Sequence, residues 1–413
     1  MSHLQEDREI LQPLAERYAA IAHLEVQRER MERYYLTNGC QEVRPVVLID
    51  EVPWGEIRDP FLVNRCALPE HQGLEGLLRR SLYQWDHFQV DKVFSPVFQV
   101  GKHVRSTGIG LEVKDIQIKG DTGAYIASHE YIDQLATDAD LARLHPPQLS
   151  YDREGTERAA EVAAGVFAGL MEVEVIGQVF QYNIWDQIAC YRGVDKLLLD
   201  LVERPDFMHR IARRFMEIAQ ATLAQCVELD LLHATPLILH CTPACVRDLP
   251  AADFAGRVRP KDTWGRCSAQ IFSAVSPAMH DEFDLVYNQQ LFRDCGLLYY
   301  GCCEPLDTKI HLLRERFANL RKVSITPWAD PERAAEGLGR DLVMAAKPNP
   351  AFVGSPTFDP APVRQEIDRI LSACRRHGTA CELVIKDIST IANRPENLTQ
   401  WAATVAEVID RHY

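Results

Sequence analysis

Short apolar runs recur along the chain and alternate with longer amphipathic stretches. The run Val46-Val47-Leu48-Ile49 is too short for a buried helix and ends at the acidic pair Asp50-Glu51, which is typical of a buried parallel strand. Further runs of strand length lie at residues 93–100, 173–180, 237–239, 297–300, 323–325, 342–346 and 383–385. Because strands that alternate with helices pack side by side in one direction, this pattern predicts a parallel β-sheet.

The stretches between these runs have the three- and four-residue spacing of amphipathic helices. Pro205 occupies a first-turn position, and Ser276-Pro277 has the form of an N-cap followed by proline at the first helical position. The N-terminal segment up to Gly39 is helical in pattern as well, and that glycine is a C-terminal stop. Residues 111–126 differ, because their alternation around a Gly-Asp-Thr-Gly turn predicts an inserted antiparallel hairpin.

The number of strand and helix units favours one closed barrel over an open sheet with two domains, since no Ser/Gly-rich linker divides the chain. We therefore predict an α/β fold. It consists of a single (β/α)8 TIM barrel over residues 44–413, with an inserted β-hairpin, preceded by an N-terminal helical arm over residues 1–43. In such barrels the chemistry lies at the carboxyl ends of the strands. The residues that follow each apolar run are therefore the candidates for function.

Charge and composition narrow the classes of partner. The chain has 59 Asp and Glu against 45 Lys and Arg, a formal net charge of -14, which would repel a polyphosphate. No run approaches the roughly 18 apolar residues that span a bilayer, and the N-terminus is too charged for a signal peptide. Twelve cysteines without CxxC spacing are typical of reduced thiols. We expect a cytoplasmic protein that binds neither nucleic acid nor a membrane.

The strongest local signal is the turn at residues 300–305, Tyr-Gly-Cys-Cys-Glu-Pro, where glycine and proline bracket two thiols and a carboxylate directly after a strand. His240 follows another apolar run. Thiolate and imidazole are the ligands that zinc prefers, so Cys302, Cys303 and His240 are candidate zinc ligands. The alternative is that the two cysteines pack a tight turn and that His240 orients a loop.

Charged and aromatic residues after the other runs could bind a substrate or carry protons. Glu304 and Asp387 are the candidate proton-transfer groups. Lys347 and Lys386 could hold an anionic group, although Asp387 could equally pair with Lys386. The full set of candidate substrate-binding residues is Asp50, Glu51, Trp54, Lys347, Asn349 and Lys386.

Six segments of the chain resemble the uroporphyrinogen decarboxylase superfamily. They are RPVVLI at 44–49, RPDFMH at 204–209, FSAVSPAM at 272–279, YGCCEPL at 300–306, KPNP at 347–350 and RPENL at 394–398. The resemblance spans most of the chain after residue 40 and implies a single-domain (β/α)8 barrel. It also implies one of two activities, either tetrapyrrole decarboxylation or methyl transfer to or from a cobalt corrinoid carried by a partner protein.

Two places in the sequence distinguish these activities. Decarboxylases of the superfamily carry Arg-Gln-Ala-Gly after the first strand, where arginine holds substrate carboxylates. This chain has Asp50-Glu51-Val52-Pro53 there, which would repel a polycarboxylate. Zinc-dependent methyltransferases of the superfamily have His-x-Cys after a middle strand and another cysteine near the last one. Here Cys303 matches the first cysteine, but Gly301 stands at the histidine position. The second cysteine is matched by Lys386 or Asp387.

We therefore expect an enzyme, a corrinoid-dependent methyltransferase that moves a methyl group between a small methylated compound and a corrinoid protein. Zinc held by Cys302, Cys303 and His240 would act as a Lewis acid on the acceptor thiol or the leaving group. Two alternatives remain open. One is a decarboxylase that uses Lys347 or Lys386 to hold a carboxylate. The other is a non-catalytic barrel that binds a corrinoid or a partner.

Overall fold

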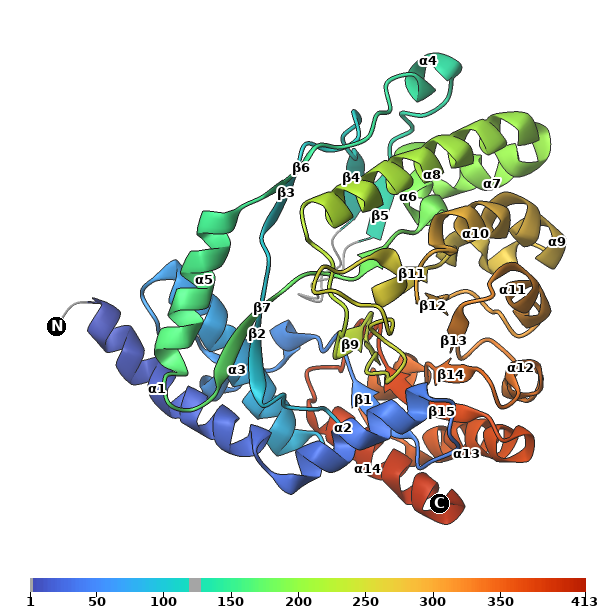
Figure 1. Ribbon diagram of the computed structural model, residues 1–413. Coiled ribbons are helices and arrows are strands. Elements are labelled where there is room, and N and C mark those ends of the chain that lie inside the picture. The colour runs from blue at the N-terminus through green and yellow to red at the C-terminus, as the bar shows by residue number, and fades with distance from the viewer. Residues whose placement is uncertain (1–2, 119–127) are drawn as a thin grey trace.

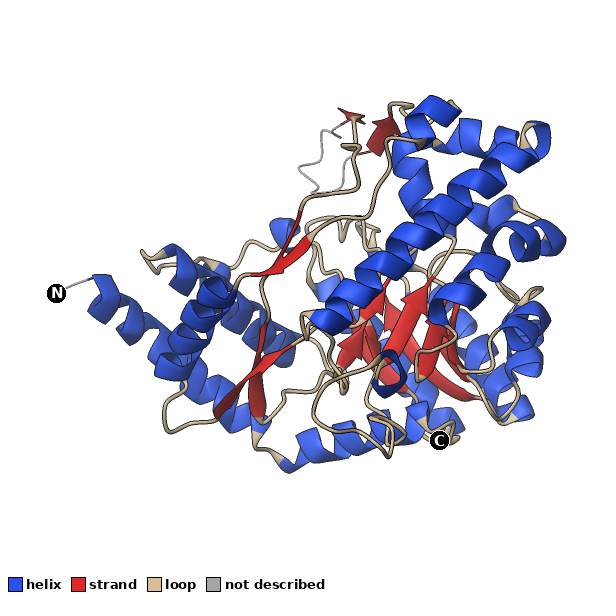
Figure 2. Cartoon of the chain, turned by 45° about the horizontal axis from the view of Figure 1, so that its top comes forward, coloured by secondary structure: helices blue, strands red, loops and turns tan. Residues whose placement is uncertain are grey.

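The centre of the protein is a seven-stranded parallel sheet (Figures 1 and 2). The computed structural model describes residues 3–118 and 128–413. In spatial order the strands are β1 (Val46–Ile49), β15 (Ala380–Ile385), β14 (Val343–Ala346), β13 (Leu320–Ile325), β12 (Leu297–Tyr300), β11 (Trp264–Cys267) and β8 (Phe180–Gln181). All neighbouring pairs are parallel. The predicted α/β class is therefore confirmed.

The sheet is consistent with a barrel, but strand pairing does not close it. In the described residues β1 pairs only with β15 and β8 pairs only with β11, so seven strands of the predicted barrel are present and its closure with an eighth stays a prediction. The run at 93–100 contains Pro96, which has no N–H to donate. Strand β2 (Val97–Gly101) begins after this proline and pairs with β7 (Glu172–Ile176) in a separate parallel ribbon. The run at 173–180 is thus divided between that ribbon and β8.

The run at 237–239 is not a strand of the parallel sheet either. Strand β9 (Ile238–Leu239) pairs antiparallel with β10 (Thr242–Pro243) in a short hairpin. Pro236 and Pro243 flank and end this segment, and a residue without an N–H is unsuited to a central strand. The prediction for this run is therefore wrong in its pairing.

The β9–β10 hairpin is bound to the sheet through its backbone carbonyls. Trp264 Nε1 donates to Ala244 O at 2.9 Å, and Lys322 Nζ donates to Pro243 O at 2.6 Å. Asn38 Nδ2 also donates to Pro243 O, at 3.1 Å. These contacts join the hairpin to β11, to β13 and to the N-terminal helices.

Helices pack against the sheet strands in the order that the sequence pattern predicts (Figure 1). Pro205 lies in the first turn of α8 (Pro205–Glu228), and Ser276 Oγ accepts from Met279 N at the start of α9 (Pro277–His280), so both predicted starts are confirmed. The α-helices that follow β8 in the chain are α6 (Ile184–Arg192), α7 (Val194–Glu203), α8 (Pro205–Glu228), α9 (Pro277–His280), α10 (Val286–Phe292), α11 (Ile310–Arg316), α12 (Pro331–Leu338), α13 (Pro360–His377) and α14 (Glu396–His412).

The N-terminal segment is helical as its pattern predicts. Helices α1 (His3–Ala22) and α2 (Glu25–Asn38) occupy it, and Gly39 follows the second helix. Helix α1 packs with α3 (Pro69–His87) and α5 (Arg153–Val166) beside the β2–β7 ribbon, around the second apolar cluster of the protein (Figure 1). The predicted boundary between residues 43 and 44 stays a prediction.

The inserted hairpin is confirmed as an antiparallel pair of β4 (Asp115–Ile118) and β5 (Ser128–Tyr131). Its second strand begins after the predicted end at Ile126, and residues 119–127 lie outside the described ranges. Strands β3 (Val104–Ser106) and β6 (Leu149–Tyr151) form another antiparallel pair. The short helix α4 (Asp138–Leu141) lies between β5 and β6 in the chain.

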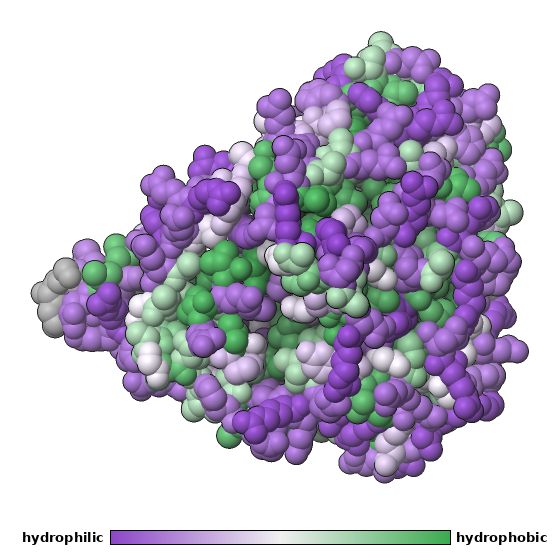
Figure 3. Space-filling view, viewed as in Figure 1, coloured by the Kyte–Doolittle hydropathy of each residue, from purple (hydrophilic) through white to green (hydrophobic). Residues whose placement is uncertain are grey.

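Most of the visible surface is polar. Figure 3 shows hydrophilic residues over most of one face, with hydrophobic residues gathered in hollows near its middle. Within residues 3–118 and 128–413, none of the helices combines the length and the apolar character needed to cross a bilayer.

Candidate active site

The carboxyl ends of β12 and β15 bring two cysteines, a histidine and a lysine into contact. Cys302 and Cys303 follow β12, Lys386 follows β15, and His240 lies between β9 and β10. The two sulfurs are 3.5 Å apart, and His240 Nε2 lies 3.1 Å from Cys302 Sγ. Lys386 Nζ lies 3.4 Å from Cys302 Sγ and 3.7 Å from Cys303 Sγ. We call these four side chains the thiol cluster. All three predicted metal ligands belong to it.

Two carboxylates continue the thiol cluster toward solvent. Asp387 Oδ2 accepts from Lys386 Nζ at 2.6 Å and from Cys303 Sγ at 3.2 Å. The backbone N–H of Asp387 donates to Glu51 Oε2 at 2.7 Å. The side chain of Lys386 is 2% exposed and that of Asp387 is 50% exposed, so the ion pair joins the buried cluster to the surface.

The backbone at this end of the sheet is strained. Glu51, His240, Cys241 and Asp387 have φ angles of 50°, 44°, 69° and 55°, in the left-handed region that L-residues other than glycine rarely adopt. They are four of the eight such residues in the described ranges. Strained residues of this kind gather at functional sites, where the surrounding structure holds them.

Gly301 is required by the shape of the turn that carries the two cysteines. Its φ is 99°, and a Cβ added there would lie 2.5 Å from the side chain of Leu306. A side chain at this position would therefore force the turn to change. The imidazole of the site comes from His240 instead, on the β9–β10 hairpin.

Charges are divided unequally within the thiol cluster. The hydrogen bond with Cys303, together with His240 and Lys386, lowers the pKa of Cys302 below its usual value, although burial opposes this. The same hydrogen bond and burial raise the pKa of Cys303, so that this thiol keeps its proton. Burial lowers the pKa of Lys386, but the two sulfurs and Asp387 outweigh it and the pKa is raised. The cluster therefore holds a thiolate and a thiol against an ammonium.

The predicted zinc site does not fit this arrangement. In the described parts of the chain, no three His, Cys, Asp or Glu side chains form a group that could hold a metal ion. Lys386 Nζ lies within 3.7 Å of both sulfurs and 2.6 Å from Asp387 Oδ2. An ammonium thus contacts the donor atoms that zinc would need to share, and two like charges cannot occupy that space together.

Glu304 anchors the turn and does not face the opening. Its Oε2 accepts from Cys302 N and its Oε1 accepts from Ala269 N, both at 2.9 Å. The side chain is fully buried, and burial raises the pKa of this carboxyl. In this structure Glu304 positions the backbone of Cys302, and its predicted proton-transfer role stays a prediction.

Two of the predicted substrate-binding residues lie together at a cavity of about 690 Å³. Glu51 and Trp54 line it, together with Asp387 and Arg80, whose guanidinium lies over the Trp54 ring at 5.6 Å. Because Asp387 also contacts Cys303, this cavity opens directly beside the thiol cluster. Asp50 accepts from Glu51 N at 2.7 Å and supports the loop.

Lys386 belongs to the thiol cluster, whereas two further predicted substrate-binding residues lie elsewhere. Lys347 and Asn349 line a different cavity, of about 250 Å³, against α13. Asn349 Oδ1 accepts from Ala351 N and caps the 3-10 turn Pro350–Val353. Lys347 is 4% exposed, its Nζ has no partner among the described residues, and burial lowers its pKa to about 8.

Sequence reasoning missed two polar residues close to the turn at residues 301–304, Arg266 and Asp186. Arg266 of β11 is 2% exposed and donates to Asn183 Oδ1 at 3.2 Å and to Gly301 O at 3.4 Å. Asp186 at the start of α6 accepts from Gln270 Nε2 at 3.1 Å. Burial and the neighbouring Glu304 raise the pKa of Asp186 to about 7. The strand that carries Arg266 reads Trp-Gly-Arg-Cys, which is not an apolar run, so no sequence signal marked it.

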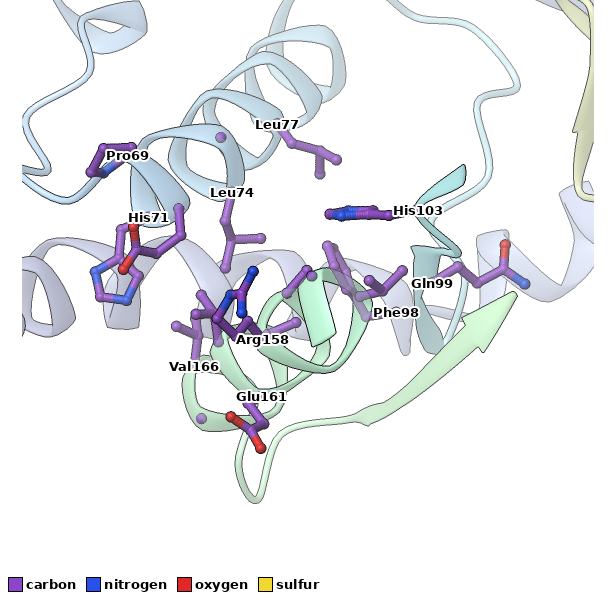
Figure 4. Close-up of a pocket in the computed structure, with 18 of the residues that line it drawn as sticks. Pro69, His71, Leu74, Leu77, Phe98, Gln99, His103, Arg158, Glu161 and Val166 are labelled. Carbon is purple, nitrogen blue, oxygen red and sulfur yellow. The ribbon is translucent and has the colours of Figure 1, made fainter. Parts of the chain in front are cut away.

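A cavity larger than the one beside Glu51 and Trp54 is separate from this site. It has a volume of about 880 Å³ and lies between α1, α3, α5 and β2. Figure 4 shows Leu74 and Leu77 of α3 near Phe98 and His103, with Arg158 at one side. None of the predicted site residues lines it. Size alone therefore does not identify the reactive site.

The structure is similar to that of a methyltransferase from Methanosarcina mazei. The two chains are 11% identical, the TM-score is 0.48, and the similarity covers 92% of this chain and 98% of that chain. No protein-family model matches the sequence, and none of the curated proteins matches it. At this TM-score the similarity does not bear on activity, and membership of the uroporphyrinogen decarboxylase superfamily stays a prediction.

Proposed function

We propose that this protein is a methyltransferase that moves a methyl group between a small methylated compound and a corrinoid carried by a partner protein. The methylated compound would bind in the cavity beside Glu51 and Trp54. The observation that carries the proposal is the contact of this cavity, through Asp387, with the buried side chains of the thiol cluster. The six sequence segments that resemble the superfamily support it.

A corrinoid on the partner would supply the cobalt centre that takes the methyl group, and the heteroatom that loses the methyl group would then need a proton. The chain has proton donors at the edge of the cavity for this purpose. Lys386 and Cys303 both carry protons, and Asp387 accepts from each of them. Such a group acts as a general acid when the leaving atom lies within hydrogen-bond reach.

The sulfur of Cys302 holds the Lys386 ammonium in position. It lies 3.4 Å from Lys386 Nζ, and Glu304 fixes its backbone N–H. A fixed anion beside the ammonium keeps that proton donor in one place before the substrate arrives. Preorganised charges of this kind contribute to catalysis because they need no rearrangement during the reaction.

Decarboxylation has less support from the geometry. A carboxylate in the cavity would meet the carboxylates of Glu51 and Asp387, with Arg80 as a cation on the wall. Lys347, which was predicted to hold an anion, lines a different cavity. Like charges at short distance oppose binding.

Methylcobalamin provides a direct test as the methylated corrinoid probe. The full chain is mixed with it under anaerobic conditions, together with a small thiol, phenol or amine as methyl acceptor. We expect chain-dependent loss of the methylcobalamin spectrum and a methylated acceptor in the mass spectrum. Lys386→Met should reduce the rate about 100-fold. Cys40→Ser is the matched control, because Cys40 Sγ donates a hydrogen bond to Asp341 O, away from the thiol cluster.

Two results would overturn the proposal. One is that the chain does not accelerate the loss of methylcobalamin with any acceptor, compared with the mixture without protein. The other is that Lys386→Met and the unaltered chain transfer the methyl group at the same rate. Binding of methylcobalamin without any spectral change would instead support the non-catalytic barrel.

A further inference from the structure

Cys302 and Cys303 are the one pair of adjacent cysteines in the sequence. Their sulfurs are 3.5 Å apart on the same side of the turn. Cys302 is 3% exposed, whereas Cys303 is only partly buried and faces Asp387 at the opening. A small oxidant that enters beside Asp387 therefore meets both sulfurs together.

The surroundings of these two sulfurs favour oxidation. Lys386 Nζ contacts both of them, and His240 Nε2 lies 3.1 Å from Cys302 Sγ. Cationic and N–H donor groups beside a sulfur stabilise its negative form, which is the form that attacks an oxidant. Reactive cysteines lie in such partly accessible, electropositive places.

Another cysteine pair in the same protein shows the contrast. Cys374 and Cys381 are 0% and 2% exposed. Cys374 Sγ lies 3.6 Å from Met344 Sδ, and Cys381 Sγ donates to the Glu382 carbonyl. Neither contact supplies a cation, so this pair is expected to be inert and serves as an internal reference.

We infer that Cys302 and Cys303 form a site of reversible oxidation, at which hydrogen peroxide converts the two thiols into a vicinal disulfide. The sulfur of Cys302 attacks one peroxide oxygen, the O–O bond breaks, and a sulfenic acid and hydroxide result. The sulfur of Cys303 then displaces the sulfenic oxygen, which leaves as water with the thiol proton. The pair loses two electrons to peroxide, so no other oxidant is required.

Strain makes this disulfide easy to reduce. Adjacent Cα atoms lie about 3.8 Å apart across a trans peptide, below the roughly 4.4–6.8 Å usual for disulfides. Disulfides with such geometry have more oxidising potentials and are the labile ones. Glu304 and Gly301 hold the turn in one shape, so the sulfurs must approach by side-chain rotation.

Oxidation would also remove the thiolate that contacts Lys386. Methyl transfer should then stop until a reductant restores the thiols, a consequence that rests on the proposed function. The oxidation itself does not, because it can be measured by mass in the absence of any corrinoid.

The test uses the full chain treated with about one equivalent of hydrogen peroxide, alkylated after denaturation, and digested for mass spectrometry. We expect the peptide with Cys302 and Cys303 to lose about 2 Da and to resist alkylation, with full recovery after dithiothreitol. Cys374 and Cys381 should remain alkylated throughout. The Cys303→Ser variant should instead trap a sulfenic acid on Cys302, a gain of about 16 Da.

Lys386→Met should slow the loss of free thiols about 10-fold, while Cys40→Ser should leave it unchanged. The inference is overturned if the peptide keeps two alkylated cysteines, or if it passes directly to products that dithiothreitol does not reverse. A disulfide between two chains, seen as a dimer on a non-reducing gel, would overturn it as well. Circular dichroism of each variant separates these results from misfolding. A mass loss without any methyl transfer would leave the inference standing and count against the proposed function alone.

Discussion

Two lysine–carboxylate pairs of the sheet have nearly the same geometry and very different surroundings. Lys322 Nζ lies 2.8 Å from Glu382 Oε2, and Lys386 Nζ lies 2.6 Å from Asp387 Oδ2. In the first pair the side chains are 1% and 0% exposed. In the second they are 2% and 50% exposed. The distance between partners therefore does not reveal which pair is structural and which is chemical.

The two pairs differ in the other contacts of their lysines. Lys322 Nζ donates to the Pro243 carbonyl, so the inner pair fixes the β9–β10 hairpin to the sheet. Lys386 Nζ contacts two sulfurs beside a cavity. Burial lowers the pKa of Lys322 and Glu382 opposes this, whereas the neighbours of Lys386 raise its pKa. The inner pair is thus committed to the fold, and the outer pair is available to a ligand.

The largest effect is expected from breaking the inner pair. Glu382→Ala leaves the Lys322 ammonium buried without its counter-charge, which should reduce the free energy of unfolding by about 3–5 kcal/mol. Urea unfolding followed by circular dichroism measures this. The double variant Lys322→Met with Glu382→Leu should recover much of the loss, because no isolated charge remains. A loss of less than about 1 kcal/mol in the single variant would show that the two pairs do not differ in the way proposed.

The outer pair should show the reverse combination. Lys386→Met is expected to change the free energy of unfolding by no more than about 1 kcal/mol, because its partner is half exposed. Its rate of methyl transfer should nevertheless fall about 100-fold, equivalent to about 2.7 kcal/mol of barrier. Unfolding curves and initial rates on the same preparation give both numbers. A large stability loss with a proportional loss of rate would place Lys386 with Lys322 as a structural residue.

A smaller effect is expected from Asp186, a carboxylate of the site without a lysine partner in the described residues. Burial and Glu304 raise its pKa from 3.8 to about 7, so the folded protein binds more protons than the unfolded chain between these values. Its contribution to stability should therefore decrease as pH rises from about 4 to about 7, by up to about 1.4 kcal/mol per pH unit.

Unfolding free energies measured across this range test the sign. The slope should be flatter in Asp186→Asn than in the unaltered chain. An identical slope in both would mean that Asp186 titrates normally in the folded protein.

The sequence predicted those parts of the fold whose signal is local. The run at Leu297–Tyr300 is strand β12 with the same bounds, because four apolar residues bounded by glycine suit a buried strand. The cap at Ser276 depends on one side chain and the next three residues. The strand-end rule led us to expect His240 near Cys302, and the two are in contact, but His240 reaches the site from the antiparallel β9–β10 hairpin and not from the end of a parallel strand.

The missed parts depend on contacts between distant residues. Strand β11 contains Gly265 and Arg266, so its burial comes from its neighbours and not from its own composition. The open edge of β1 could not be foreseen, since Pro96 shifts the next strand into another ribbon. The direction of the Glu304 side chain, toward two backbone amides, is likewise invisible in the order of residues.

The left-handed residues at Glu51, His240, Cys241 and Asp387 have a consequence for how this chain would change over generations. Each such backbone costs of the order of 1–3 kcal/mol, a cost that glycine would largely remove. If selection acted on stability alone, glycine would thus accumulate at these four positions. Relatives that retain residues other than glycine there, although glycine would be more stable, would be those in which the activity is still under selection.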